Sequence, residues 1–260
     1  MDQDKPVALV SGATSGIGLA VAEQLACARH RVFLGARTAE NVSATVKSLR
    51  EQGFDVAGAA VDVRSSAGVA DFVGAALDEW GRVDVLVNNA GRSGGGVTAE
   101  IADELWLDIM ETNLNSVFRL TREVLTRGGM LDRERGRIIN IASTAGKQGV
   151  VYGAPYSASK HGVVGFTKAL GNELAPTGVT VNAVCPGYVE TPMAQAIRQR
   201  YATAFDTTED AIRQRFTAKI PLGRYSTPQE VAGLVGYLAS DLAASITAQA
   251  LNVCGGLGNF

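Results

Sequence analysis

VALV at residues 7–10, followed directly by SGATSGIG at residues 11–18, is the stretch that decides the fold of this chain. Four successive apolar residues are typical of a strand that is buried on both faces of a parallel sheet. The residues after the glycines predict a helix, because Ile17, Val21 and Leu25 share one helical face. A glycine-rich turn between strand and helix lets the backbone approach a pyrophosphate at the helix N-terminus. The stretch therefore predicts the first βα unit of a dinucleotide-binding sheet.

The rest of the chain repeats this alternation of strand and helix. Apolar runs predict further strands at about 31–36, 56–61, 83–87, 137–142, 180–184 and 250–253, and helical periodicity predicts helices at about 39–52, 66–80, 103–127 and 155–175. Strict alternation favours a Rossmann-type α/β fold, in which a doubly wound parallel sheet of about seven strands carries helices on both faces. Because no repeat or linker interrupts the pattern, residues 1–260 are expected to form a single domain.

The stretch from about 190 to 222 breaks the rhythm between two elements of the core. Two short helices are predicted there, each with an apolar face, formed by Met193, Ile197 and Tyr201 in the first and by Ile212, Phe216 and Ile220 in the second. A capping box at Thr207 and Asp210 is expected to start the second helix. An extra helical pair at the carboxyl end of a strand predicts a lid over the substrate.

Composition and charge exclude several classes of function. The net charge is −2 at pH 7, so no bulk attraction to nucleic acid or to a membrane surface is expected. The three cysteines form no CxxC pair and the chain has two histidines, so no metal site is predicted. Sparse cysteines, no long apolar span and no N-terminal signal peptide favour a cytoplasmic protein.

The residue after the second predicted strand discriminates between nicotinamide cofactors. Proteins that bind NAD usually place an acid there to hold the ribose 2′-hydroxyl group. This chain has Arg37 instead, which can pair with the 2′-phosphate of NADPH, although a solvated surface arginine is the alternative interpretation. Asp62 and Val63 follow the third strand, where they are placed to contact the adenine ring. The pattern predicts NADPH/NADP+ as the cofactor.

The segment YSASK places Tyr156 and Lys160 four residues apart, on one face if the segment is helical. A nearby ammonium group favours the phenolate and makes the phenol a stronger acid. Ser143 follows the fifth predicted strand, and Asn113 lies in the long helix before it. Each residue alone has an ordinary structural interpretation as a surface pair, a cap or a buried polar group. Their order, at strand ends where such sheets bind ligands, favours an active site.

Together these motifs resemble those of the short-chain dehydrogenases/reductases over essentially the whole chain. The matching motifs are the SGATSGIG loop, NNAG at 88–91, Asn113, Ser143, YSASK at 156–160, and Pro186-Gly187 with Thr191. The resemblance implies that Tyr156 protonates the forming alkoxide, and that Ser143 holds the carbonyl oxygen. It further implies that Lys160 binds the nicotinamide ribose and tunes Tyr156, while Asn113 positions a water that relays protons. The cofactor-binding residues it implies are Gly12, Thr14, Ser15, Gly16, Ile17, Gly18, Arg37, Asp62, Val63, Asn89, Ala90, Gly91, Tyr156, Lys160, Pro186, Gly187, Val189 and Thr191.

Within this family the chain is most similar to ketoreductases of type II aromatic polyketide synthases, such as the actinorhodin and hedamycin enzymes. The similarity rests on three glycines after Arg92-Ser93, on residues 145–171 and on NVCGGLGNF at 252–260; Ser93 and Cys254 depart from the pattern. It implies an antibiotic-pathway enzyme that reduces a polyketide held by phosphopantetheine on an acyl carrier protein, alongside other synthase subunits, as a homotetramer. The residues expected to contact the substrate are Ser93, Gly94, Gly95, Val150 and Tyr201.

Other functions remain open on the sequence. A fatty-acid 3-oxoacyl carrier-protein reductase, or a reductase of free cyclic ketones, would use the same four residues. A cofactor-sensing regulator on the same fold is disfavoured because such proteins typically lose the Tyr or the Lys. Arg37, Arg64 and Arg92 all follow strands and are expected at one rim of the cleft, either as solvated loop charges or as a docking patch for an acidic carrier protein.

Overall fold

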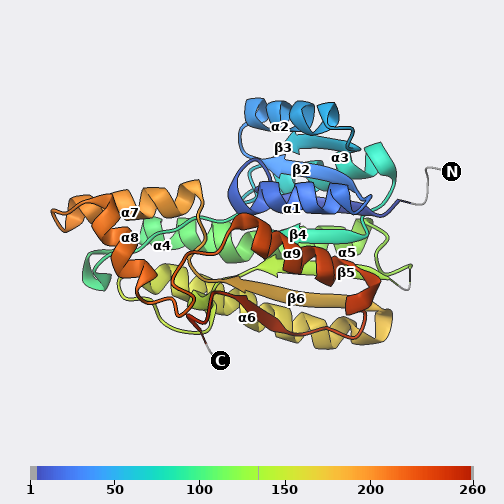
Figure 1. Cartoon of the computed structure of the whole chain (residues 1–260). Coiled ribbons are helices and arrows are strands. Elements are labelled where there is room, and N and C mark those ends of the chain that lie inside the picture. The colour runs from blue at the N-terminus through green and yellow to red at the C-terminus, as the bar shows by residue number, and fades with distance from the viewer. Residues whose placement is uncertain (1–4, 134, 259–260) are drawn as a thin grey trace.

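The computed structural model describes residues 5–133 and 135–258, which are built on one seven-stranded sheet in the order β3-β2-β1-β4-β5-β6-β7 (Figure 1). All neighbouring strands are parallel. The strands are β1 (Val7–Ser11), β2 (Arg31–Ala36), β3 (Val56–Ala60), β4 (Val85–Asn88), β5 (Gly136–Ile141), β6 (Val179–Pro186) and β7 (Ala250–Val253). The order reverses between β1 and β4, where doubly wound sheets bind ligands. The predicted fold class is confirmed; Asn259 and Phe260, which carried part of the resemblance, lie outside the described residues.

Helices pack on both faces of the sheet and bury its apolar side chains (Figure 1). One face is covered by α1 (Gly16–Cys27), α2 (Ala39–Glu51) and α9 (Pro228–Ala239). The other face is covered by α3 (Ser66–Trp80), α5 (Ser116–Arg127) and α6 (Ala154–Leu174). Strands buried on both faces explain why the strand sequences are continuous apolar runs rather than alternating ones.

The prediction of one regular helix over 103–127 is wrong at its centre. The segment begins as α4 (Asp103–Met110), widens into a π-helical turn (Glu111–Asn115) and continues as α5. Asn113 lies in this turn and is fully buried. A π-turn inside a helix is rare and is frequent at functional sites, because it re-aims a side chain without ending the helix.

The helical pair predicted for 190–222 is confirmed as α7 (Pro192–Ala204) and α8 (Glu209–Thr217), which project beyond the carboxyl ends of the strands (Figure 1). The predicted capping box is wrong. The N-cap of α8 is Thr208, one residue later than expected, and its hydroxyl accepts a hydrogen bond from Ala211 N at 3.2 Å. A single threonine cap is sufficient to start the helix.

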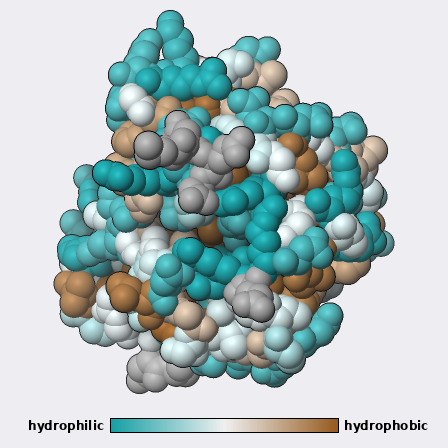
Figure 2. All heavy atoms as spheres, turned by 90° about the vertical axis from the view of Figure 1, so that its right-hand side faces the viewer, coloured by the Kyte–Doolittle hydropathy of each residue, from teal (hydrophilic) through white to brown (hydrophobic). Residues whose placement is uncertain are grey.

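The opposite end of the molecule, where the strands begin, presents a largely hydrophilic surface with scattered apolar side chains (Figure 2). Ion pairs lie at the strand beginnings there, among them Arg31–Asp55 at 3.2 Å, which joins β2 to the segment before β3, and Arg82–Asp84 at 2.8 Å within the segment before β4. In the part of the chain that the structure describes, no helix is long and apolar enough to cross a membrane. The glycine loop, the π-turn and the α7–α8 pair predicted as a lid all lie at the other end of the sheet.

Candidate active site

The glycine loop after β1 is packed so closely that side chains would not fit at Gly12 or Gly18. Gly12 has a φ of +66°, which is strained for residues with a Cβ atom. A Cβ on Gly18 would lie 2.1 Å from Gly12 O and 2.4 Å from Asn89 Nδ2. Asn89 Nδ2 donates to Ser11 O at 3.0 Å and to Gly12 O at 2.9 Å. The predicted NNAG segment therefore fixes the shape of the predicted cofactor loop.

The first turn of α1 is open to an anion. Its N-cap Ser15 makes no side-chain capping bond and its first turn carries no acid. Gly16 approaches Thr191, because a Cβ placed on Gly16 would lie 3.3 Å from the Thr191 Cγ2 atom. Thr191 in turn caps α7 by accepting from Ala194 N at 3.2 Å. Two helix N-termini thus lie near this loop, and the uncapped N–H groups of α1 fit the pyrophosphate of a dinucleotide.

Arg37 lies at the end of β2 with an exposed side chain, and no ion pair holds it among the described residues. Asp62, on the next strand end, is engaged by Arg64, which lowers the pKa of its carboxyl group. The free guanidinium of Arg37 fits a 2′-phosphate, as the sequence predicts. Val63 and Val189 are different: their side chains are buried in the core, so only their backbone atoms remain for a cofactor.

Tyr156, Ser143 and Lys160 are brought together by α6 and the end of β5. The Ser143 hydroxyl is hydrogen-bonded to the Tyr156 phenol and accepts from Ala145 N at 3.1 Å. Lys160 Nζ lies 5.9 Å from the centre of the Tyr156 ring and donates to Ile141 O at 2.8 Å. A phenol and a serine hydroxyl side by side can both donate to one carbonyl oxygen.

Burial controls the protonation of this group. Burial raises the pKa of Tyr156, against the effect of the Ser143 hydrogen bond, so the phenol is protonated at neutral pH. Burial lowers the pKa of Lys160 to about 8, and its side chain is 5% exposed. The expectation that the ammonium group lowers the pKa of Tyr156 is therefore not met in this structure. A protonated phenol next to an amine that titrates near neutrality is suited to donate a proton and recover it.

The π-turn aims Asn113 at the loop after β4. Asn113 Oδ1 accepts from Arg92 N at 2.8 Å, and Nδ2 donates to Arg92 O at 3.0 Å and to Ser159 Oγ at 3.1 Å. Both amide hydrogens are used in these bonds. A methyl group placed on Gly91 would lie 3.3 Å from Asn113 Oδ1 and 3.7 Å from Lys160 Nζ. The loop, Asn113 and Lys160 thus form one packed unit, and the geometry assigns the Asn113 side chain to the loop.

The expected substrate residues fall into two groups. The 93–95 loop packs directly against the backbone at Tyr152. A Cβ on Gly95 would lie 2.0 Å from Tyr152 O, and Gly96 N donates to the same oxygen at 2.9 Å. Val150, in that facing loop, is 44% exposed. Tyr201 is instead part of an aromatic cluster in and below the lid, where its ring lies 5.6 Å from that of Phe216. The structure thus places Ser93, Gly94, Gly95 and Val150 on adjacent loops, and Tyr201 in the lid cluster.

Several polar residues within the predicted motifs hold these segments together, a role that the sequence did not predict for them. Ser11 Oγ accepts from both Asn89 N and Ala90 N at 3.1 Å. Asn88 Nδ2 donates to Asn140 Oδ1 at 2.8 Å, which ties β4 to β5 behind the site. Ser159, one residue before Lys160, accepts from Asn113. The position of Ser11 and Asn88 at the last residues of strands was the available signal.

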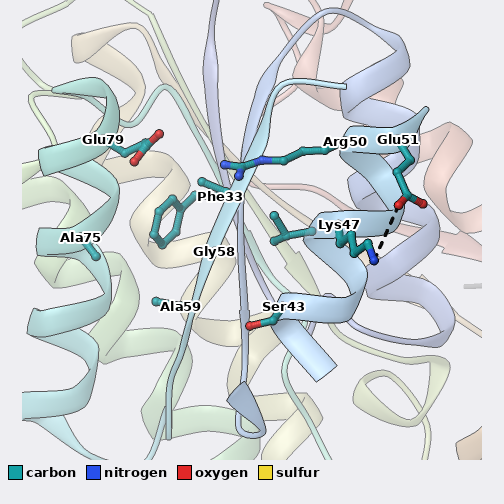
Figure 3. Close-up of a pocket in the computed structure, with 11 residues that line it drawn as sticks. Phe33, Ser43, Lys47, Arg50, Glu51, Gly58, Ala59, Ala75 and Glu79 are labelled. Atoms are coloured by element: carbon teal, nitrogen blue, oxygen red, sulfur yellow. Dashed lines mark ion pairs between the residues drawn. The ribbon is translucent and has the colours of Figure 1, made fainter. Parts of the chain in front are cut away.

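A separate groove of about 760 Å³ opens over edge strand β3, between α2 and α3 (Figure 3). Lys47, Arg50 and Glu51 line one side and Glu79 the other, above a floor that includes Gly58 and Ala59. Strands β2, β1 and β4 separate β3 from β5, which leads to Ser143. The groove is therefore not part of the candidate site. No cluster of three potential metal ligands occurs within residues 5–133 and 135–258.

Comparison with known proteins assigns this site to a family. Residues 6–202 match the family model described as short chain dehydrogenase. The chain is a short-chain dehydrogenase. Enzymes of this family are oxidoreductases that use NAD(H) or NADP(H), which agrees with the open N-terminus of α1 and the free Arg37.

Relatives of this short-chain dehydrogenase include reductases of polyketide synthases. It is 76% identical over 254 residues to a ketoacyl reductase of the monensin polyketide synthase from Streptomyces virginiae, covering 98% of this chain and 97% of that protein. It is 64% identical over 256 residues to a granaticin polyketide synthase ketoacyl reductase from Streptomyces violaceoruber, covering 98% and 94%. The crystal structure of a single-residue variant of the actinorhodin polyketide ketoreductase with NADPH superposes with a TM-score of 0.97, at 60% identity over 99% of both chains.

Proposed function

We propose that the chain is an NADPH-dependent ketoreductase that reduces one keto group of a carrier-protein-bound aromatic polyketide during antibiotic biosynthesis. The observation that carries this proposal is that Ser143, Tyr156 and Lys160 lie together at the carboxyl end of the sheet. The chain that holds them is 60–76% identical to polyketide ketoreductases over nearly its whole length. The open anion site at α1 and the free Arg37 support NADPH as the cofactor.

In the proposed reaction the bound cofactor supplies a hydride to the carbonyl carbon. Tyr156 gives its phenolic proton to the carbonyl oxygen as negative charge develops there. Ser143 donates a second hydrogen bond to the same oxygen and holds it in place. Lys160 returns a proton to Tyr156, which suits an amine whose pKa lies near 8. Asn113 fixes the backbone at Arg92, so that this loop is already in place when the substrate binds.

The aromatic cluster supports a ring-containing substrate. Tyr188 stacks on Phe216 with centroids 4.9 Å apart, and on Tyr225 at 5.4 Å. Tyr201 meets the same Phe216 ring edge-on. Tyr188 follows the Pro186-Gly187 segment, so this cluster supports a proposal of flat, aromatic substrates rather than long flexible acyl chains.

We further propose a partner and an assembly. Arg37, Arg64 and Arg92 follow the carboxyl ends of β2, β3 and β4, and form the rim at which an acidic acyl carrier protein and its phosphopantetheine arm dock. The enzyme acts in the cytoplasm with the other synthase subunits, as one 1–260 domain per subunit of a homotetramer.

Reconstitution tests the function directly. The purified chain is incubated with NADPH and a minimal polyketide synthase, and the products are identified by mass spectrometry and NMR. We expect one defined ketone of the polyketide to become a secondary alcohol. Reduction of a linear 3-oxoacyl carrier-protein substrate at equal or higher kcat/KM would favour the fatty-acid alternative instead.

A further inference from the structure

Four charged side chains from three separate segments form one chain of ion pairs at the rim of the site. Arg64 Nη2 binds Asp62 Oδ2 at 2.7 Å, and Arg64 Nη1 binds Asp108 Oδ1 at 2.8 Å. Arg92 binds the second oxygen of the same Asp108 carboxylate. One carboxylate therefore joins two guanidinium groups that belong to the loops after β3 and β4.

Asp108 lies on α4, immediately before the π-turn that carries Asn113. Asn113 holds the backbone of Arg92, and Asp108 holds its side chain. Both contacts come from the same helical segment. The position of Arg92 is thus set by α4 and its π-turn rather than by the glycine-rich loop that follows it.

The ion-pair chain borders an open hollow of about 460 Å³, which is lined by Asp62, Arg64, Ser65, Leu107, Asp108 and Glu111. Arg64 and Arg92 side chains are each 44% exposed, whereas Asp108 is 24% exposed. Glu111 is engaged by Arg119 at 2.6 Å. The two arginines are therefore reachable by a ligand, but two aspartates balance their charge.

Two guanidinium groups that share one carboxylate also suit a phosphate group, which offers more oxygens and more negative charge. A phosphate that binds Arg64 and Arg92 has to displace Asp108 or lie next to its negative charge. Displacement breaks the ion pairs of Asp108 with the two arginines, and a phosphate beside Asp108 meets repulsion between like charges, so either event weakens binding.

We propose that Asp108 is an internal competitor for Arg64 and Arg92, and that it limits how tightly the rim binds the phosphate group of an incoming thioester arm. This inference rests on the proposed function, in which a phosphopantetheine arm enters at the rim. Asp108 acts through the two arginines and is a positioning residue that determines substrate affinity.

The test compares two thioesters of one acyl group, one of N-acetylcysteamine and one of 4′-phosphopantetheine. Only the second carries a phosphate, so the first reports whether the reduction machinery is intact. Steady-state kinetics are measured for the wild type, for Asp108→Asn and for Glu104→Gln. Glu104 is the matched control, because it lies one turn earlier on α4 and is exposed.

We expect Asp108→Asn to raise kcat/KM for the phosphopantetheine thioester about three- to tenfold, through KM. The N-acetylcysteamine thioester should change less than about twofold, and Glu104→Gln should change neither. The gain should shrink as ionic strength rises. The competitor role is overturned if Asp108→Asn leaves kcat/KM for the phosphopantetheine thioester unchanged or lowers it, while kcat/KM for the N-acetylcysteamine thioester stays at the wild-type value.

A double variant, Arg64→Ala with Arg92→Ala, separates this inference from the docking proposal. If the double variant leaves KM for the phosphopantetheine thioester unchanged, the docking proposal itself is wrong. If it raises that KM while Asp108→Asn has no effect, docking at the arginines stands and only competition by Asp108 is refuted.

Discussion

The glycine loop and the lid lie at the same end of the sheet but are held together by opposite means. In the loop, atoms of the backbone meet directly, as where Gly18 leaves no room for a Cβ beside Gly12 O. In the lid, side chains from distant positions meet instead. Arg198 is 5% exposed and binds Glu190 at 2.7 Å and Glu209 at 3.0 Å. A site formed by backbone contacts has no room for added atoms, whereas in a site formed by side-chain contacts a substitution changes stability or affinity by a moderate amount.

The largest effect on cofactor affinity is expected where an added methyl group meets backbone. Gly18→Ala should lower NADPH affinity roughly a hundredfold or more, because its Cβ overlaps Gly12 O and Asn89 Nδ2. Isothermal titration and thermal melting measure this. Gly74→Ala, in the interior of α3, is the control: its Cβ would meet only the flexible Arg127 side chain at 3.4 Å, and stability should rise slightly. If Gly18→Ala binds NADPH normally, the claim that the glycine loop has no room for added atoms, unlike the lid, is wrong.

A charge change at the edge of the cofactor site comes next. Wild type should prefer NADPH to NADH by about tenfold to over a hundredfold in kcat/KM, because Arg37 pairs with the 2′-phosphate. Arg37→Asp should erode or reverse this preference while leaving NADH turnover close to wild type. Equal efficiency of the wild type with both cofactors would contradict the assignment.

The titration of Lys160, beside Tyr156, gives the reaction a pH dependence. Since the ammonium form is the proton source, the reduction rate should fall about tenfold per pH unit above its pKa of about 8. The unfolding free energy should instead rise with pH. The folded pKa lies below the ordinary value of 10.5, so the unfolded chain binds the proton more tightly, and folding improves as pH rises between these values.

Between about pH 7 and pH 9 the gain in unfolding free energy should be about 1 kcal/mol. Urea unfolding of wild type and Lys160→Met at both pH values isolates this contribution. A wild-type stability change with pH no larger than that of Lys160→Met would show that burial does not lower the pKa of Lys160.

The smallest effect on ligand binding or turnover is expected in the lid. Arg198→Met should raise KM for a bulky ketone a few-fold and lower the unfolding free energy by about 1–2 kcal/mol, because Glu190 and Glu209 lose their shared partner. NADPH affinity should not change. Arg200→Met, at an exposed position on the same helix, is the matched control. Loss of NADPH affinity in Arg198→Met with an unchanged ketone KM would show that the lid serves the cofactor site.

The same contrast explains what the sequence predicts and what it does not. The sheet, the lid helices and the glycine loop follow from local patterns, since a buried parallel strand is a continuous apolar run and Gly12 must have a positive φ. The π-turn at Asn113 was not predictable, because α-helical and π-helical turns carry the same residues. Arg198 and Asp108 were missed because their partners lie on other segments, where sequence spacing gives no signal.

The most direct measurement is the turnover of Tyr156→Phe with NADPH and a bicyclic ketone, together with its NADPH affinity. The substitution keeps the ring beside Lys160 and removes only the proton that the account assigns to the alkoxide. We predict that turnover is abolished while the dissociation constant for NADPH stays within a few-fold of wild type. Turnover above a few per cent of wild type, with NADPH binding intact, would show that Tyr156 is not the acid and would contradict the account.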